Sequence, residues 1–218
     1  MGRDLLHLRD ISHIADTFDP SNVEEIVFPS ETVETYLKRW VSRSTATNNL
    51  LVYGPPGTGK TRATYLLARD RCSAFLDLDP IHYVECESGT FDELLQLRKN
   101  QTTVLLQAFD SSFETISILD EVDNFKSSQQ QQLKKIMERT NHTYILLTNN
   151  LKSIDIGIRN RCLEIPWFIP SFERCQNRLR HLASKVTNKT LDDGLLRDTV
   201  YTTAGWRQMV RNLDFLHS

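Results

Sequence analysis

The sequence has few cysteines, almost no excess charge and no long apolar run, and each shortage excludes a class of protein. No window approaches the ~20 consecutive apolar residues that span a bilayer. The N-terminal MGRDLLHLRD also lacks the apolar core of a signal peptide, so we expect an intracellular protein. The four cysteines include no Cys-x-x-Cys pair, which favours reduced thiols over a metal site. Because the formal net charge is only −2, DNA binding would need basic residues gathered on one face.

Short apolar runs of strand length recur along most of the chain, and helical patterns separate them. The runs occupy residues 49–53, 74–78, 116–119, 144–148 and 162–165. The helical patterns occupy residues 61–71, 91–99, 103–109 and 128–139. Continuously apolar runs are typical of strands buried on both faces. The alternation therefore predicts an α/β fold with a parallel five-stranded sheet flanked by helices.

The pattern changes after residue 165. Pro166 and Pro170 interrupt the chain, and residues 172–186 then form an amphipathic helical pattern, with further helices expected at 192–201 and 206–216. We therefore expect an α/β domain over residues 1–165 and a small all-helical domain over residues 166–218. A domain of about fifty residues is small to fold alone, so it should pack on the larger one.

The strongest motif is GPPGTGKT at residues 54–61, which follows an apolar run and precedes a helical pattern. In such a loop, backbone N–H groups face phosphate oxygens, and the helix N-terminus adds partial positive charge. Lys60 is expected to reach the β- and γ-phosphates, and the Thr61 hydroxyl to hold Mg²⁺. The residues expected to contact the nucleotide here are Gly54, Pro55, Pro56, Gly57, Thr58, Gly59, Lys60 and Thr61.

An acidic pair, Asp120–Glu121, ends the apolar run of TISILDEVD, 60 positions after Lys60. Ligands bind at the carboxyl ends of strands in open α/β sheets. Asp120 is suited to the magnesium shell, and Glu121 is free to orient and deprotonate the attacking water. Asp123 is interpreted as a helix-capping or surface carboxylate.

A polar end also follows the run in YILLTNN, residues 144–150. If this strand lies beside the Asp120 strand, Asn149 points at the same water or at the γ-phosphate. The alternative is a turn asparagine, which also suits Asn150. Both interpretations of Asn149 are open at this point.

Together these motifs resemble those of AAA+ ATPases, and more narrowly the ATPase subunits of sliding-clamp loaders: replication factor C small subunits and their T4-like phage counterparts. GPPGTGKT is similar to the family's Walker A motif and ILDEVD to its Walker B motif. TNN followed by NRC is similar to its sensor 1 and Ser-Arg-Cys motifs. Asn149 and Cys162 are thirteen positions apart, the separation that the family uses. The resemblance covers residues 27–213.

The resemblance implies a Mg²⁺-dependent ATPase with a helical lid after its sheet, and it implies roles for further residues. Arg161 is implied as an arginine finger in the nucleotide site of a neighbouring subunit, with Arg159 as the alternative. A guanidinium suits that role because it is always charged and contacts phosphate bidentately. Arg207 resembles the sensor 2 arginine, which contacts the γ-phosphate of its own subunit. Backbone near Val27 and Phe28 is implied to cover the adenine of ATP.

The sequence departs from this family in three places. Asn160 stands where the family has serine before the finger. The polar residue that ends the family's second strand, and restrains the catalytic glutamate until DNA arrives, matches Asp77. The family continues into a third, helical collar domain, whereas this sequence ends at Ser218. We expect either a shortened chain or a minimal relative, suggestive of a virus or mobile element, that assembles through its ATPase contacts or a partner.

The function implied is that of a subunit in a homo- or hetero-oligomeric ring or spiral, which couples ATP binding to primer–template DNA and to opening or loading of a sliding clamp. The alternatives are a collar-less DNA-associated regulator, such as a helicase loader or transposition ATPase, and a non-catalytic interaction subunit. The intact Lys60, Asp120 and Glu121 disfavour the last. The candidate DNA contacts are Lys126, Ser127, Ser128, Lys134 and Arg139. A solvated helix face is the alternative for each, and the sequence favours it slightly.

Overall fold

The computed structural model describes residues 19–45, 48–73, 80–87, 90–92, 114–138, 142–187 and 191–217. Its centre is a five-stranded sheet in the order β2-β3-β4-β1-β5, and the four described strand pairings are parallel. The strands are β1 (Leu50–Tyr53), β2 (Ile81–Glu85), β3 (Thr115–Asp120), β4 (His142–Thr148) and β5 (Leu163–Pro166). The predicted α/β fold with a parallel five-stranded sheet is confirmed.

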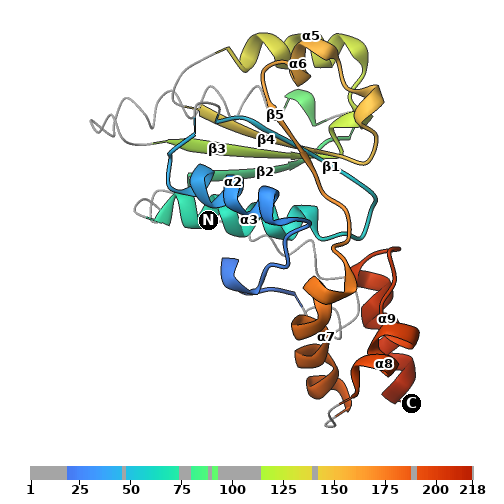
Figure 1. The fold of residues 1–218 in the computed structure, drawn as a ribbon. Coiled ribbons are helices and arrows are strands. Elements are labelled where there is room, and N and C mark those ends of the chain that lie inside the picture. Colours follow the sequence, from blue (N-terminus) through green and yellow to red (C-terminus); the bar gives the residue numbers. More distant parts are fainter. Residues whose placement is uncertain are drawn as a thin grey trace, which may run out of the picture.

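Helices cover both faces of the sheet (Figure 1). On one face lie α2 (Glu31–Val41) and α3 (Lys60–Arg71); on the other lie α5 (Ser127–Ile136) and α6 (Ile156–Arg159). Successive strand residues enter opposite cores, since Leu50 and Val52 pack in the cluster of α2 and α3, whereas Leu51 packs in that of α5 and α6. Burial on both faces is the reason that these strands are continuously apolar.

Short 3₁₀ turns connect several of these elements. They are η2 (Val23–Glu25), η4 (Val122–Asn124) and η5 (Leu151–Ser153). The helix α2 begins after Ser30, whose hydroxyl accepts a hydrogen bond from the N–H of Val33 at 3.2 Å. The helix α3 begins after Gly59, so its N-terminus lies directly at the end of the glycine-rich loop.

The C-terminal helices form a separate lobe below the sheet in Figure 1. They are α7 (Phe172–Thr187), α8 (Asp193–Leu195), η6 (a π-helix, Leu196–Val200) and α9 (Trp206–His217), and they enclose their own apolar core. Ion pairs tie α7 to α2, from Arg174 to Glu34 at 2.9 Å, and to η2, from Arg178 to Glu25 at 3.1 Å. The division into domains at residue 165 stays a prediction.

One strand was missed by the sequence analysis. The apolar run at residues 74–78, with Asp77, lies outside the described residues, as do most of the helical pattern at 91–99 and all of that at 103–109. The strand that pairs with β3 is instead β2, an edge strand in which only Val84 is buried. Its end residue Glu85 is in register with Asp120. On the β2 side of the acidic pair, the residue that ends the neighbouring strand is therefore Glu85.

The described cysteines are free thiols: Cys72, Cys86 and Cys175 are buried, and Cys162 is half-buried. Burial is the main cause that raises the pKa of each, to about 11 for Cys72 and to about 12 for Cys162 and Cys175. None of the helices in the described part of the chain combines the length and the apolar character needed to traverse a bilayer.

Candidate nucleotide site

The glycine-rich loop connects β1 to α3 at the carboxyl end of the sheet. Gly57 and Gly59 have φ of 76° and 87°, in the region that glycine adopts without a steric penalty. At Gly54 a Cβ would overlap the carbonyl oxygen of Trp167. The Thr58 hydroxyl donates to the carbonyl oxygen of Pro55 at 2.9 Å and closes the turn. The loop thus combines turns that need glycine with a direct connection to the α3 N-terminus, a helix end suited to binding phosphate.

Lys60 is the buried cation of this loop, with 6% of its surface exposed. Its Nζ donates to the carbonyl oxygens of Gly54 and Pro55, at 2.7 and 2.8 Å, and to Asn149 Oδ1 at 3.0 Å. An ammonium group has three donors, and all three have acceptors. Burial lowers the pKa of Lys60, and the negative charge of Asp120 opposes that shift.

The contact with Lys60 places Asn149 at the loop, and the pairing of β4 with β3 supplies the neighbouring strands that the first interpretation assumed. The neighbouring Asn150 behaves as the turn residue, since its side chain accepts a hydrogen bond from the N–H of Lys152 and caps η5. The catalytic role of Asn149 stays a prediction.

Asp120 and Thr61 lie in direct contact. Thr61 Oγ1 donates to Asp120 Oδ2 at 2.6 Å, and Tyr83 Oη donates to the same oxygen at 3.1 Å. The N–H of Glu121 donates to Asp120 Oδ1 at 2.9 Å. A hydroxyl beside a carboxylate supplies the hard oxygen ligands that Mg²⁺ prefers, so the donor set fits the predicted metal. Burial and the charge of Asp120 raise the pKa of Tyr83, a residue that the sequence analysis missed together with β2.

Glu121 has φ 55° and ψ 43°, in the left-handed region that non-glycine residues rarely adopt. Such backbone costs about 1–3 kcal/mol and is concentrated at functional sites. Asn124 holds this residue twice: its N–H donates to the Glu121 carbonyl oxygen at 2.9 Å, and its Nδ2 donates to Glu121 Oε2 at 3.1 Å. Asp123 is half-buried and accepts from Thr148 Oγ1 at 2.8 Å. This hydrogen bond joins η4 to β4. Asp123 is therefore a contact between two elements, and the interpretation as a helix-capping or surface carboxylate was wrong.

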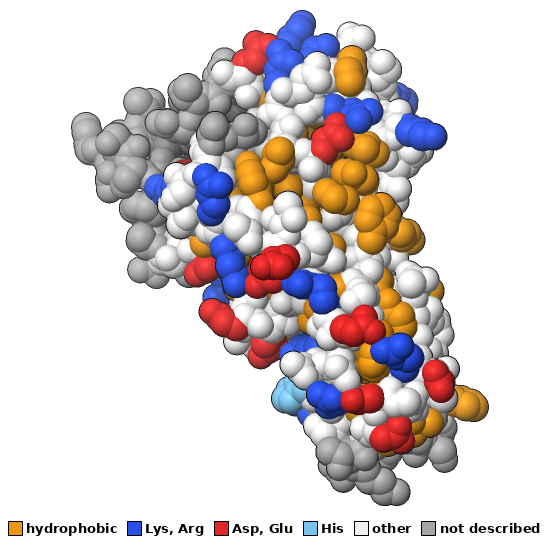
Figure 2. Space-filling view, in the orientation of Figure 1, with side chains coloured by type: hydrophobic (Ala, Val, Ile, Leu, Met, Phe, Trp, Pro, Cys, Tyr) orange, Lys and Arg blue, Asp and Glu red, His pale blue; other side chains and the backbone are white. Residues whose placement is uncertain are grey.

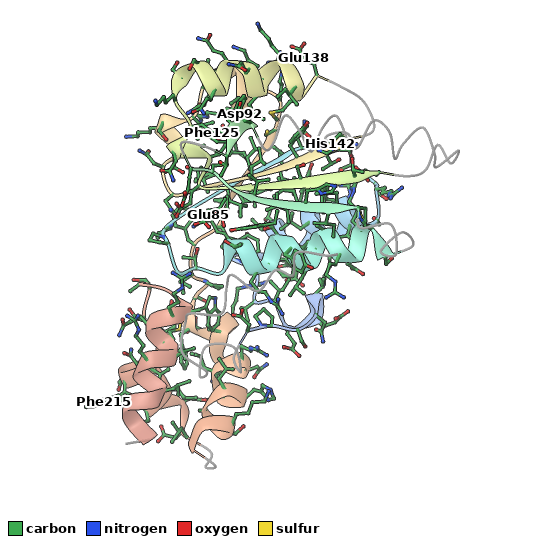
Figure 3. The ribbon with its side chains drawn as sticks, turned by 180° about the vertical axis from the view of Figure 1, so that it is seen from behind. Glu85, Asp92, Phe125, Glu138, His142 and Phe215 are labelled. Carbon is green, nitrogen blue, oxygen red and sulfur yellow. The ribbon has the colours of Figure 1, made fainter. Side chains whose placement is uncertain are left out.

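Acidic groups crowd this end of the sheet. The pKa of Glu85 is raised, first by burial and then by the charges of Glu121 and Asp120. Figure 3 shows Glu85 at one end of the strands and His142 at the other. Further negative charge beside these carboxylates would be repelled, and the nearby Lys60, together with a bound cation, would offset that repulsion.

The C-terminal lobe touches the glycine-rich loop through its backbone. The N–H of Trp206 donates to the Gly57 carbonyl oxygen at 2.8 Å, and a Cβ on Gly205 would lie 2.7 Å from that oxygen. Arg207 comes next, with its Cδ 3.9 Å from the Cβ position of Gly57. Arg207 is thus beside the loop, and its contact with the γ-phosphate stays a prediction. On the other side, Val27 packs against the core of the lobe.

Arg161 is not brought to this cluster. It lies two positions before β5, at the amino end of a parallel sheet whose carboxyl end carries Lys60; four strand residues span about 13 Å. Its Nη1 donates to the Gly157 carbonyl oxygen at 2.7 Å, and its Nη2 pairs with Glu138, which Figure 3 shows at the outer end of α5. The Arg161 side chain is 33% exposed. Arg159 pairs with Glu164 at 2.7 Å.

Comparison with known proteins gives a family and several relatives. Residues 50–169 match the family described as "ATPase family associated with various cellular activities (AAA)". Replication factor C small subunit 2 of Pyrobaculum islandicum is 30% identical over 188 residues, which are 85% of this chain and 57% of the relative. Replication factor C small subunit of Thermofilum pendens is 32% identical over 184 residues, 83% of this chain and 55% of the relative. The chain thus spans less than two thirds of the relatives' length.

Among solved structures, the RuvB Holliday junction branch migration motor of Thermotoga maritima has a similar fold. The TM-score is 0.60 at 15% identity, over 92% of this chain and 64% of that one. The family match covers more than half of the 218 residues and includes the glycine-rich loop, the Asp120–Glu121 pair and Asn149. On these grounds the chain belongs to the AAA family of ATPases.

Proposed function

We propose that this chain is an ATP-hydrolysing subunit of a clamp-loader-like complex, which couples ATP binding to DNA binding and to the opening or loading of a sliding clamp. The observation that carries the ATPase part is the cluster of Lys60, Thr61, Asp120 and Asn149 at one end of the sheet. The similarity to replication factor C small subunits supports the clamp-loader part.

In the proposed reaction, the loop N–H groups and Lys60 hold the phosphates of ATP. Lys60 exchanges its contacts with Gly54, Pro55 and Asn149 for phosphate oxygens. Thr61 and Asp120 are the residues that would hold Mg²⁺, which neutralises phosphate charge when bound. Asn149 orients the attacking water and Glu121 accepts its proton, while the water oxygen bonds to the γ-phosphorus and ADP leaves with the bridging oxygen.

The second cation of the site comes from another subunit in this proposal. Because Arg161 lies at the opposite end of the sheet from its own Lys60, it serves a neighbouring copy or a related AAA+ chain. Its ion pair with Glu138 is partly exposed, and surface pairs contribute only about 0–1 kcal/mol, so the arginine is released at little cost. Arg159 is the alternative finger. Within its own subunit, Arg207 contacts the γ-phosphate, and backbone near Val27 and Phe28 covers the adenine.

DNA contact is proposed for the α5 side of the molecule. Lys126, Ser127 and Ser128 are exposed at the start of α5, and Lys134 forms a 3.6 Å pair with Asp155. Arg139 lies outside the described residues. Lys and Arg side chains gather at the top of the space-filling view, over α5 and α6 (Figure 2). Contacts of Lys, Arg and Ser side chains with DNA phosphates give binding that does not depend on the DNA sequence, and the contacts of the charged side chains weaken as the salt concentration rises.

A mixing experiment tests the shared site. Glu121→Gln protein and Arg161→Ala protein are each expected to be nearly inactive alone. Mixed with one another, they should give ATPase activity that depends on their ratio, because some interfaces then pair an intact Glu121 with an intact Arg161. Activities that merely add at every ratio would contradict a site built by two chains.

A second assay tests the clamp-loader role. ATPase activity is measured with primed DNA alone and with primed DNA plus a sliding clamp, with Lys60→Ala as the inactive control. Stimulation that requires the clamp supports the proposal. Stimulation by DNA that is indifferent to the clamp favours a helicase loader or transposition ATPase instead.

A further inference from the structure

Tyr83 reaches the site from β2, the strand that the apolar pattern of the sequence did not indicate. We propose that Tyr83 is a positioning residue, which fixes the Asp120 carboxylate in the orientation needed for Mg²⁺-dependent nucleotide binding. This inference rests on the proposed ATPase function and adds to it a residue outside the loop and strand motifs. Its basis is the 3.1 Å hydrogen bond from Tyr83 Oη to Asp120 Oδ2, the oxygen that also accepts from Thr61.

The strand register explains how Tyr83 arrives there. Tyr83 pairs with Ile118 in the parallel ladder between β2 and β3. Ile118 and Asp120 are two positions apart, so their side chains leave the same face of the sheet. The aromatic ring of Tyr83 packs against the core cluster on that face, which also contains residues of α3. Thr61 belongs to α3, so the two donors approach Asp120 Oδ2 from one side of the sheet.

Three donors hold the carboxylate of Asp120: one from β2, one from α3 and one from the residue that follows β3. Tyr83 and Thr61 occupy Oδ2, and the N–H of Glu121 occupies Oδ1. The terminal torsion of an aspartate side chain is broad by itself, so each added donor narrows the range of orientations open to the carboxylate plane. With the Tyr83 hydroxyl in place, Oδ2 stays directed at the Thr61 hydroxyl.

Tyr83 acts through Asp120 and has no described contact with Lys60 or Asn149. Its loss should therefore weaken the part of nucleotide binding that depends on Mg²⁺ and leave the metal-free part unchanged. Removing a hydrogen-bond partner of a metal ligand commonly lowers metal affinity by about 10- to 100-fold. We expect a change at the low end, about 10-fold, since Thr61 and the Glu121 N–H remain.

The test is Tyr83→Phe in the full chain, which removes one oxygen and keeps the ring in the core. ATP binding is measured by calorimetry in proteins that also carry Glu121→Gln, so that ATP is not hydrolysed. One series contains excess EDTA, and the other contains increasing concentrations of Mg²⁺. The half-saturating Mg²⁺ concentration should rise about 10-fold, while the affinity in EDTA and the melting temperature without nucleotide stay as in the parent. Tyr65→Phe is the matched control, because Tyr65 packs against the same core cluster and should leave both binding curves unchanged.

Two results overturn the inference. In one, Tyr83→Phe has the parent's Mg²⁺ dependence. In the other, it loses ATP affinity equally with and without Mg²⁺, which indicates a general packing role. In both cases the ATPase proposal survives if the parent binds ATP with Mg²⁺ and Lys60→Ala does not. If the parent itself fails to bind ATP, the proposed function falls and the inference falls with it.

Discussion

Replacing Gln130 by alanine should destabilise the protein, whereas the same change at the neighbouring glutamine should not. Residues 129–132 are four consecutive glutamines on α5. Gln130 is buried, and Gln131 is exposed. The Nε2 of Gln130 donates to the carbonyl oxygens of Phe125 at 3.1 Å and Ser153 at 3.2 Å, and its Oε1 accepts from the N–H of Asp155 at 2.8 Å.

The magnitude follows from these three contacts. Each hydrogen bond contributes about 1 kcal/mol net, and a buried group left without a partner costs about 1–3 kcal/mol. Three bonds lost together predict a loss of about 3 kcal/mol. Gln130 lines a cavity of about 330 Å³, together with residues that include Phe125, Ser127 and Ser153. Water entering there can solvate part of the exposed backbone, which reduces the expected loss to about 2 kcal/mol.

The assay is urea unfolding of Gln130→Ala and Gln131→Ala, followed by circular dichroism. Gln130→Ala should lower the free energy of unfolding by about 2 kcal/mol at an unchanged m-value. Gln131→Ala should stay within about 0.5 kcal/mol of the parent, as surface substitutions usually do. Equal effects of the two changes would refute the reasoning, because helix propensity alone would then account for both.

Two further predictions concern the contacts between the lobe and the rest of the chain. The pKa of Glu34 is lowered, first by its hydrogen bond from Lys38 and also by Arg174 of α7. The stability from this carboxylate is therefore present above its usual pKa of 4.5 and is lost as the pH falls through the lower folded-state value. At pH 7, Glu34→Gln should lower the free energy of unfolding by no more than about 1 kcal/mol. At a pH below the folded-state pKa of Glu34, the variant and the parent should be equally stable. Urea unfolding under the two conditions checks this. Gly205→Ala places a Cβ 2.7 Å from the Gly57 carbonyl oxygen and breaks the Trp206 contact, worth about 1 kcal/mol. ATP binding measured by calorimetry should therefore weaken at least about 5-fold. Gly194→Ala, in the same lobe, is the control. The contact of the lobe with the loop would have no role in ATP binding if Gly205→Ala kept wild-type affinity or if Gly194→Ala lost as much.

The class of fold and the centre of the site were predictable because they depend on consecutive residues. A phosphate-binding loop is formed by eight neighbouring positions, so Gly54 to Thr61 are recognisable wherever they occur. Strands buried on both faces are continuously apolar, so β1, β3 and β4 stand out from the chain. Parallel strands end at one edge, which is why Asp120 was expected near Lys60 and why this place was one of the two interpretations of Asn149.

The edge of the sheet and the contacts across it were not predictable in this way. β2 lies at an edge of the described sheet, and His82 and Glu85 interrupt its apolar pattern, so it lacks the continuous apolar run by which the other strands were recognised. The hydrogen bond of Tyr83 to Asp120 depends on the register between β2 and β3. That register is decided by packing between segments distant in sequence.

The sequence by itself therefore determined the parallel α/β class and the residue types for binding a phosphate chain. Only the tertiary structure decided which side chains hold Asp120 and Glu121, and that Arg161 pairs with Glu138 of its own chain. The physical reason is that a local motif acts within its own turn, whereas hydrogen bonds between strands and helices exist only once the shared core has set their spacing.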